Sequence, residues 1–162
     1  MQTGNARLNT FYPVVLSALA IAAAAFLPIR GTSAQADDPP DAFVVNSGST
    51  NTFGYSIDVP RTGDASYTQG DQTGHGPIPA EVVKKFYADI DAASPLANLP
   101  RGHCMRSASF GTRTRITVGN DQSPDVDCAG NDLAAALRDD AKAIAAALGI
   151  KNQPRHPMPP PN

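Results

Sequence analysis

Two stretches in which apolar and polar residues alternate constrain most strongly what this chain can fold into. Residues 53–59 place an aromatic or aliphatic side chain at every second position, and residues 110–118 alternate in the same way. A period of two is typical of a β-strand that buries one face. Shorter apolar runs at 42–45 and 65–69 are set apart by turn-forming residues and indicate two further strands. The sequence therefore predicts an antiparallel sheet.

Two other segments carry apolar residues at helical spacing. The first is predicted at 79–93, where Pro79 suits the first helical turn and Glu81 follows it. The second begins after a cap at Asn131 or Asp132 and ends before Gly149, which is typical of the residue that follows a helix. Its expected core stripe is Leu133, Leu137, Ala141, Ile144 and Leu148.

The connecting segments complete the predicted order. Residues 70–77 are expected to form a Gly-rich loop, 119–122 a hairpin turn and 125–128 the return strand of that hairpin. The order is β-β-(β)-α-β-β-α. This order predicts an α+β fold, with an antiparallel sheet of four to five strands and two helices packed on one face.

The first 36 residues have the pattern of a cleaved signal peptide. An apolar stretch at 14–27 follows Arg7, and the small-x-small sequence Ala34-Gln35-Ala36 predicts cleavage after Ala36. We therefore expect an exported protein, periplasmic or secreted, without stable membrane insertion after cleavage; an uncleaved anchor is the alternative. Beyond the signal, residues 37–42 are predicted as a flexible lead-in, 43–150 as a single domain and 151–162 as a Pro-rich disordered tail.

Composition excludes several classes of protein. The chain has no Trp, 17% charged residues and a net charge of −2, which becomes −4 when residues 1–36 are removed. Collagen-like, coiled-coil and polytopic membrane proteins do not fit this composition. A nucleic-acid partner is not expected either, because there is no basic cluster interleaved with aromatic residues.

Two cysteines, Cys104 and Cys128, are the whole complement of the chain. In an exported protein the first interpretation is one disulfide. A metal site made by His103 with both cysteines is the rival, but it lacks a Cys-x-x-Cys pair and an evident fourth ligand. Two free thiols are the third alternative.

The remaining candidates for chemistry are isolated. His75 lies in the predicted Gly-rich loop without a partner in sequence, His103 precedes a cysteine expected to be oxidised, and His156 lies in the tail. No serine-nucleophile motif and no phosphate-binding loop is present. We therefore predict no catalytic residue and no cofactor, and His75 is the one position that an enzyme hypothesis would test.

Two charged groups remain as candidate binding elements. Asp121, Asp125 and Asp127 surround a turn and are weak candidates for a hard cation such as calcium, although their spacing is not that of an EF-hand. Arg113 and Arg115 share one face of a predicted strand. They form either a solvated face partly paired with Asp58 or an edge of a contact surface for an acidic partner.

The order of Tyr55–Val59, 81–90, 96–100, 114–118 and 133–148 resembles that of emfourin-type small bacterial domains. It is also similar to other exported bacterial domains without an assigned activity. The resemblance implies inhibition of thermolysin-type metalloproteases, but no inhibitory residue can be matched to a position here. The sequence therefore predicts an exported, disulfide-stabilised binding domain with an unknown protein partner, with a protease inhibitor and an envelope-associated structural protein as alternatives.

Overall fold

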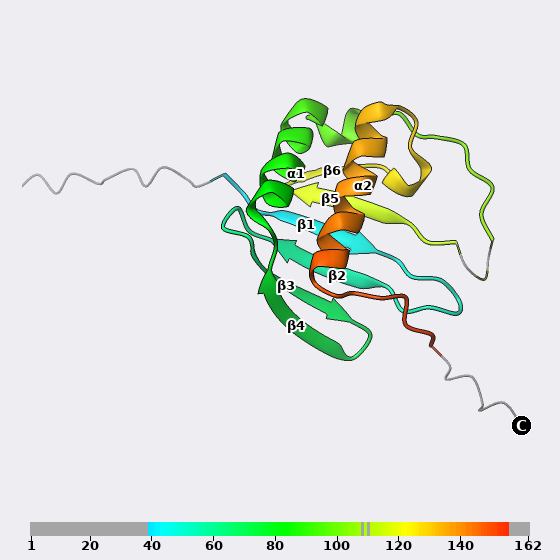
Figure 1. Ribbon diagram of the computed structural model, residues 1–162. Helices are drawn as coiled ribbons and strands as arrows, with labels where there is room; N and C mark the ends of the chain where they lie inside the picture. The colour runs from blue at the N-terminus through cyan, green and yellow to red at the C-terminus, as the bar shows by residue number, and fades with distance from the viewer. Residues whose placement is uncertain (1–38, 108, 110, 156–162) are drawn as a thin grey trace, which may run out of the picture. The chain divides into compact units, whose positions relative to one another are not determined.

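The computed structural model describes residues 39–107, 109 and 111–155, and these form an α+β domain (Figure 1). Its sheet is antiparallel and has six strands in the order β4-β3-β2-β1-β5-β6, and α1 and α2 cover one of its faces. The predicted fold class is confirmed, with more strands than expected. The elements are β1 (Ala42–Asn46), β2 (Tyr55–Val59), β3 (Asp64–Gln69), β4 (Gln72–Pro77), α1 (Ala80–Ala93), η1 (Leu96–Asn98), β5 (Thr114–Val118), β6 (Asp121–Gln122), η2 (Val126–Cys128) and α2 (Asp132–Ala147).

The predicted signal peptide, its predicted cleavage site and the end of the predicted tail with His156 lie outside the described residues. Within the described ranges, no helix has both the length and the apolar character needed to cross a membrane.

Strand β1 lies inside the sheet and joins its two halves. It pairs with β2 on one side and with β5 on the other, so Val44 lies between Ile57 and Ile116. These three side chains are fully buried against the helices. The alternate residues of the same strands point to the opposite face, which we call the outer face, and in β2 and β5 this arrangement reproduces the predicted alternation.

The two helices bury the faces that their sequences indicated. Phe86 on α1 and Leu137 and Ile144 on α2 are fully buried in the common core. Asn131 caps α2 by accepting a hydrogen bond from the Ala134 amide, and Gly149 follows the helix with a φ of 68°, as predicted. Leu133, expected in the core stripe, is instead 37% exposed, because Ala134 takes the buried position in the first turn of α2.

Strand β4 replaces the predicted Gly-rich loop. Its two glycines provide no apolar side chain that could show the alternation of a strand. Gly74 is needed for packing, since a Cβ there would lie 2.6 Å from Cζ of Tyr67 on β3. The sequence of β4 therefore shows no apolar alternation, because the Tyr67 ring occupies the space that a side chain at Gly74 would fill.

The predicted return strand at 125–128 is wrong. β6 contains only two residues, and 126–128 form the short 3-10 helix η2. Pro124 has no amide proton to continue the pairing. Side chains take over the hydrogen bonds along β5 instead: Ser123 Oγ accepts from the Ile116 amide, and Asp125 Oδ1 accepts from the Thr114 amide.

The first residues of the predicted disordered tail are attached to the domain. Gln69 Nε2 donates a hydrogen bond to the Lys151 carbonyl, and the Phe53 amide donates one to the Gln153 carbonyl. Pro154 forms a bridge with Thr52. Residues 151–155 therefore belong to the folded surface rather than to a free tail.

Candidate functional site

A disulfide between Cys104 and Cys128 forms the base of the candidate site, as predicted. The two Cα atoms lie 5.7 Å apart, and the bridge ties the segment after η1 to η2. The Gly102 amide strengthens the junction by donating a hydrogen bond to the Cys128 carbonyl. A side chain at Gly102 would collide with that carbonyl, so the two segments approach closely only with glycine at this position. Residues 101–106 are thereby held against the β5–β6 end of the sheet.

This junction borders an open pocket of about 600 Å³ that collects basic side chains. Arg101 and Arg106 come from the disulfide-bound segment, Arg113 immediately precedes β5, and Arg115 lies on it. His103 lines the same pocket. Asp125 is the one acidic residue among the lining residues. Four of the nine arginines of a chain with a net charge of −2 thus meet at one place.

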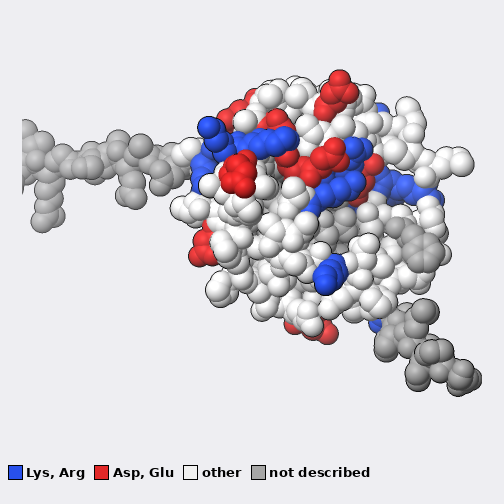
Figure 2. All heavy atoms as spheres, viewed as in Figure 1, with Lys and Arg blue, Asp and Glu red and all other residues white. Residues whose placement is uncertain are grey.

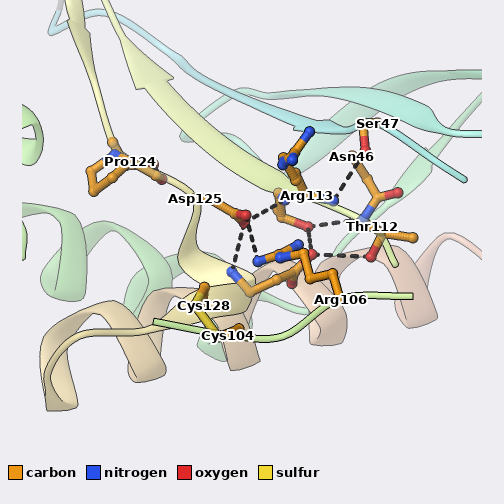
Figure 3. A network of polar contacts seen from close by, with 12 residues as sticks. Asn46, Ser47, Cys104, Arg106, Thr112, Arg113, Pro124, Asp125 and Cys128 are labelled. Atoms are coloured by element: carbon orange, nitrogen blue, oxygen red, sulfur yellow. Dashed lines mark hydrogen bonds and ion pairs between the residues drawn. A yellow bond between two sulfur atoms is a disulfide. The ribbon is translucent and has the colours of Figure 1, made fainter. Parts of the chain in front are cut away.

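Asp125 is already occupied by contacts inside the protein (Figure 3). Its Oδ2 lies 2.5 Å from Arg106 Nη2 in an ion pair, and its Oδ1 accepts hydrogen bonds from the backbone amides of Thr114 and Asp127. Arg106 is half-buried, and its Nη2 is shielded from solvent without making a hydrogen bond of good geometry. The pair fixes the pocket wall and neutralises one of the four arginines.

The other three arginines have no carboxylate partner among the described residues. Arg101, Arg113 and Arg115 are all exposed, and none takes part in an ion pair there. The predicted pairing with Asp58 is not formed, because β1 lies between the strand of Asp58 and β5. The pocket therefore has an excess of three fixed positive charges, which favours an anionic ligand.

The helix side of the molecule has a different charge pattern. Figure 2 shows Lys and Arg side chains intermixed with Asp and Glu over this face. Two of the described ion pairs illustrate the mixing: Lys85 contacts Asp140, and Arg138 contacts Asp139. On this face basic and acidic side chains are thus intermixed, whereas the lining of the pocket includes four arginines and one carboxylate.

The three candidate calcium ligands have separate structural roles. Asp121 caps η1 by accepting hydrogen bonds from the amides of Leu96 and Ala97, at 2.6 and 2.9 Å. Asp127 accepts from the hydroxyls of Thr112 and Thr114. Within the ranges that the structure describes, no three His, Cys, Asp or Glu side chains are grouped so that they could hold a metal ion.

Asp127 also acts on a neighbouring tyrosine. Burial, with a smaller contribution from the charge of Asp127, raises the pKa of Tyr55 to about 12. This phenol therefore stays protonated over the whole pH range in which the protein would work, and it cannot serve as a proton acceptor there.

The two histidines that the structure describes, His75 and His103, lie on different parts of the fold. His75 lies exposed on β4, opposite Ser66, rather than in a loop, and it has no hydrogen-bond partner in the described part of the chain. His103 lines the arginine pocket next to an oxidised cysteine. The sequence analysis missed the contribution of Arg101 and Arg106. The predicted disulfide contained that signal, since pairing Cys104 with Cys128 necessarily brings residues 101–106 close to the β5–β6 hairpin.

No family model, curated protein or solved structure matches this chain. The resemblance to emfourin-type domains accordingly stays a prediction.

Proposed function

We propose that this protein is an exported, disulfide-stabilised binding domain that recognises an acidic group of a protein partner in its arginine-lined pocket. The observation that carries the proposal is the meeting of Arg101, Arg113 and Arg115 without a carboxylate partner in the described residues. The disulfide and the predicted signal peptide support export, because disulfides persist in oxidising compartments.

Arginine is suited to this task. Its guanidinium is planar and remains charged, and it binds a carboxylate through two parallel hydrogen bonds. Three unpaired guanidinium groups at one site repel one another, and an anion bound between them relieves that repulsion. A bound carboxylate would therefore gain more from this pocket than from three separate surface arginines.

The electrostatics also predict how binding depends on salt. The pocket is open and its free arginines are exposed, so added salt screens their attraction for an anion. The chain as a whole is acidic and gives no long-range attraction to an acidic partner. Binding should therefore weaken as ionic strength rises, and it should depend on the pocket rather than on the net charge.

A comparative capture experiment tests the proposal. Oxidised protein beginning at Asp37 is the bait against the exported proteins of the source organism, with quantitative mass spectrometry as the readout. The double variant Arg113→Gln/Arg115→Gln should lose the stoichiometric partner. Its matched control, Lys84→Gln/Lys142→Gln, removes the same charge from the exposed helix surface and should retain it.

Two outcomes would contradict the proposal. The first is a partner captured equally well by both double variants, and the second is loss of capture by both. A secreted metalloprotease captured only by the wild type and the lysine control would identify the domain as a protease-binding protein.

A further inference from the structure

The outer face carries two exposed apolar side chains beside the arginines. Val45 on β1 lies directly opposite Arg115 on β5 in the strand register, and Phe43 lies two residues earlier on the same face. The exposed fractions are 37% for Val45 and 42% for Phe43. These are two of the four large hydrophobic residues exposed in the described part of the chain, and they are neighbours on one strand.

A second hollow connects this apolar strip with the arginine pocket. It has a volume of about 270 Å³ and is lined by Val45, Ser47, Arg113, Arg115 and Gln122. Arg113, Arg115 and Gln122 line both hollows, so the two are adjacent and share a wall. The backbone of this wall is firmly held, because Ser47 and Arg113 exchange hydrogen bonds: the Ser47 amide donates to the Arg113 carbonyl, and Ser47 Oγ accepts from the Arg113 amide.

We infer that the segment recognised by this site is an extended acidic peptide that carries a large apolar side chain two residues from its acidic group. This inference rests on the proposed function and adds the chemistry of the partner. The acidic group binds between the arginines, and the apolar side chain covers Val45 and Phe43.

The spacing of the sheet supports this pairing of groups. Neighbouring strands lie about 4.8 Å apart, whereas alternate side chains of an extended peptide are about 7 Å apart. Because adjacent side chains of an extended peptide point to opposite faces, a peptide crossing from β5 to β1 reaches both hollows with residues that are two apart in its sequence.

The same two features distinguish a peptide from other polyanions. A sulfated or uronic-acid polysaccharide supplies negative charge but no large aliphatic or aromatic side chain for the Val45 surface. An acidic peptide supplies both groups. Apolar surface placed next to charged hydrogen-bonding groups is also the usual composition of a specific protein contact.

Titration with end-capped hexapeptides, followed by 1H–15N NMR, tests the inference. One peptide carries Asp and Leu two positions apart with Ser at the other positions, in the second Ser replaces Leu, and in the third Asn replaces Asp. In an extended chain the two tested side chains then point to the same face. Wild-type protein should bind the Asp–Leu peptide about tenfold more tightly than the Asp–Ser peptide, which is the ratio that burial of one leucine side chain supports. The Asn–Leu peptide should bind at least about tenfold more weakly than the Asp–Leu peptide, since it leaves the arginines unpaired.

Variants of the protein test whether the preference for Leu depends on Phe43 and Val45 and whether the binding of acidic peptides depends on the arginines. Phe43→Ser/Val45→Ser should reduce the Leu-over-Ser preference to less than about twofold while leaving the affinity for the Asp–Ser peptide unchanged. Leu133→Ser is the matched control, because Leu133 is 37% exposed on α2, away from this face, and it should keep the preference. Arg113→Gln/Arg115→Gln should weaken binding of both acidic peptides.

The outcomes separate this inference from the proposed function. Equal binding of the Asp–Leu and Asp–Ser peptides, still dependent on the arginines, overturns the inference and leaves the proposed function standing. Acidic peptides that bind equally well to the arginine variant overturn both. A heparin-derived hexasaccharide that binds more tightly than the Asp–Leu peptide, and is unaffected by Phe43→Ser/Val45→Ser, assigns the pocket to a polysaccharide instead.

Discussion

Lys85 on α1 and Asp140 on α2 form an ion pair that links the two helices, with 2.6 Å between Nζ and Oδ1. The same ammonium group contacts Asp89 at 2.7 Å, so one cation is shared by two carboxylates. Asp140 is only 3% exposed, and its Oδ2 is buried without a hydrogen-bond partner among the described residues. Burial raises the pKa of Asp140 to about 6, with a further contribution from Asp89, while Lys85 opposes the shift.

The raised pKa predicts that the protein loses stability between pH 4 and pH 7. A carboxyl group whose pKa is higher in the folded state binds its proton more tightly there than in the unfolded chain. Its stabilising contribution is complete below the unfolded pKa and is lost as the pH rises through about 6. Asp140→Asn should remove this loss, because asparagine still accepts from Lys85 but carries no charge. Thermal melts at pH 5 and pH 7.5 should therefore differ less in the variant than in the wild type.

Asp139→Asn is the control for this measurement. Asp139 is the adjacent residue of α2, but it is exposed, and Arg138 holds its pKa below the usual value. Its titration is therefore complete below pH 5, and the variant should keep the wild-type difference between the two melts. An equal pH dependence in Asp140→Asn and the wild type would contradict the assignment.

The two hydrogen bonds of the Tyr87 hydroxyl predict a second effect on stability. The hydroxyl accepts a hydrogen bond from the Ala42 amide at 3.0 Å and donates one to the Val59 carbonyl, so it joins the start of β1 to the end of β2 beneath α1. Tyr87→Phe leaves both buried groups unpaired and should lower the free energy of unfolding by about 1–3 kcal/mol in urea denaturation. Tyr67→Phe should change it by less than about 0.5 kcal/mol, since the Tyr67 hydroxyl has no partner in the described residues. Equal effects of the two changes would exclude this role for Tyr87.

The disulfide predicts a third effect on the stability of the fold. Cys104 and Cys128 are separated by 24 positions. Opening a loop of this length should reduce the free energy of unfolding by about 3–4 kcal/mol in the chain-entropy model. Urea denaturation with and without reductant measures the loss, and the double variant Cys104→Ala/Cys128→Ala should show it without reductant. An unchanged midpoint under reducing conditions would disprove the stabilising role.

Ile116 tests the assignment of sheet faces. Its side chain is fully buried on β5, so Ile116→Asp places an unpaired charge in the core and should unfold the domain. Arg115→Asp, one residue away on the outer face, should keep the wild-type circular dichroism spectrum and a cooperative melt. A folded, soluble Ile116→Asp variant would show that the faces are assigned incorrectly.

The sequence was informative where side chains alternate or recur at helical spacing. The faces of β2 and β5 and the caps of α2 follow from local residue patterns, and the cysteine pair follows from the presence of two cysteines in a chain expected to be exported. β4 did not follow, because its glycines show no alternation and because the need for glycine at Gly74 arises from the Tyr67 ring on the neighbouring strand. The segment 125–128 was mistaken for a strand, because nothing in its sequence shows that Asp125 would hydrogen-bond the edge of β5.

The site was only half visible in the sequence. Arg113 and Arg115 were recognisable as a pair because they are two positions apart in the alternating segment 110–118, of which the structure forms β5 at Thr114–Val118. Arg101 and Arg106 join them through the disulfide, and the apolar side chains of β1 join them through a pairing of strands distant in the chain. A long-range register of this kind, here Val45 opposite Arg115, is not encoded in either strand alone.

The position of β1 inside the sheet has a consequence for the order of events during synthesis. β1 is made first, and β2, β3 and β4 can pair in succession along one of its sides. The other edge of β1 stays unpaired until β5 (Thr114–Val118) has been synthesised, about 70 residues later, because Val44 pairs with Ile116. Until then an unpaired strand edge is open to pairing with other chains. A nascent chain that is stalled before β5 should therefore need protection from aggregation, whereas one that has emerged past α2 should not.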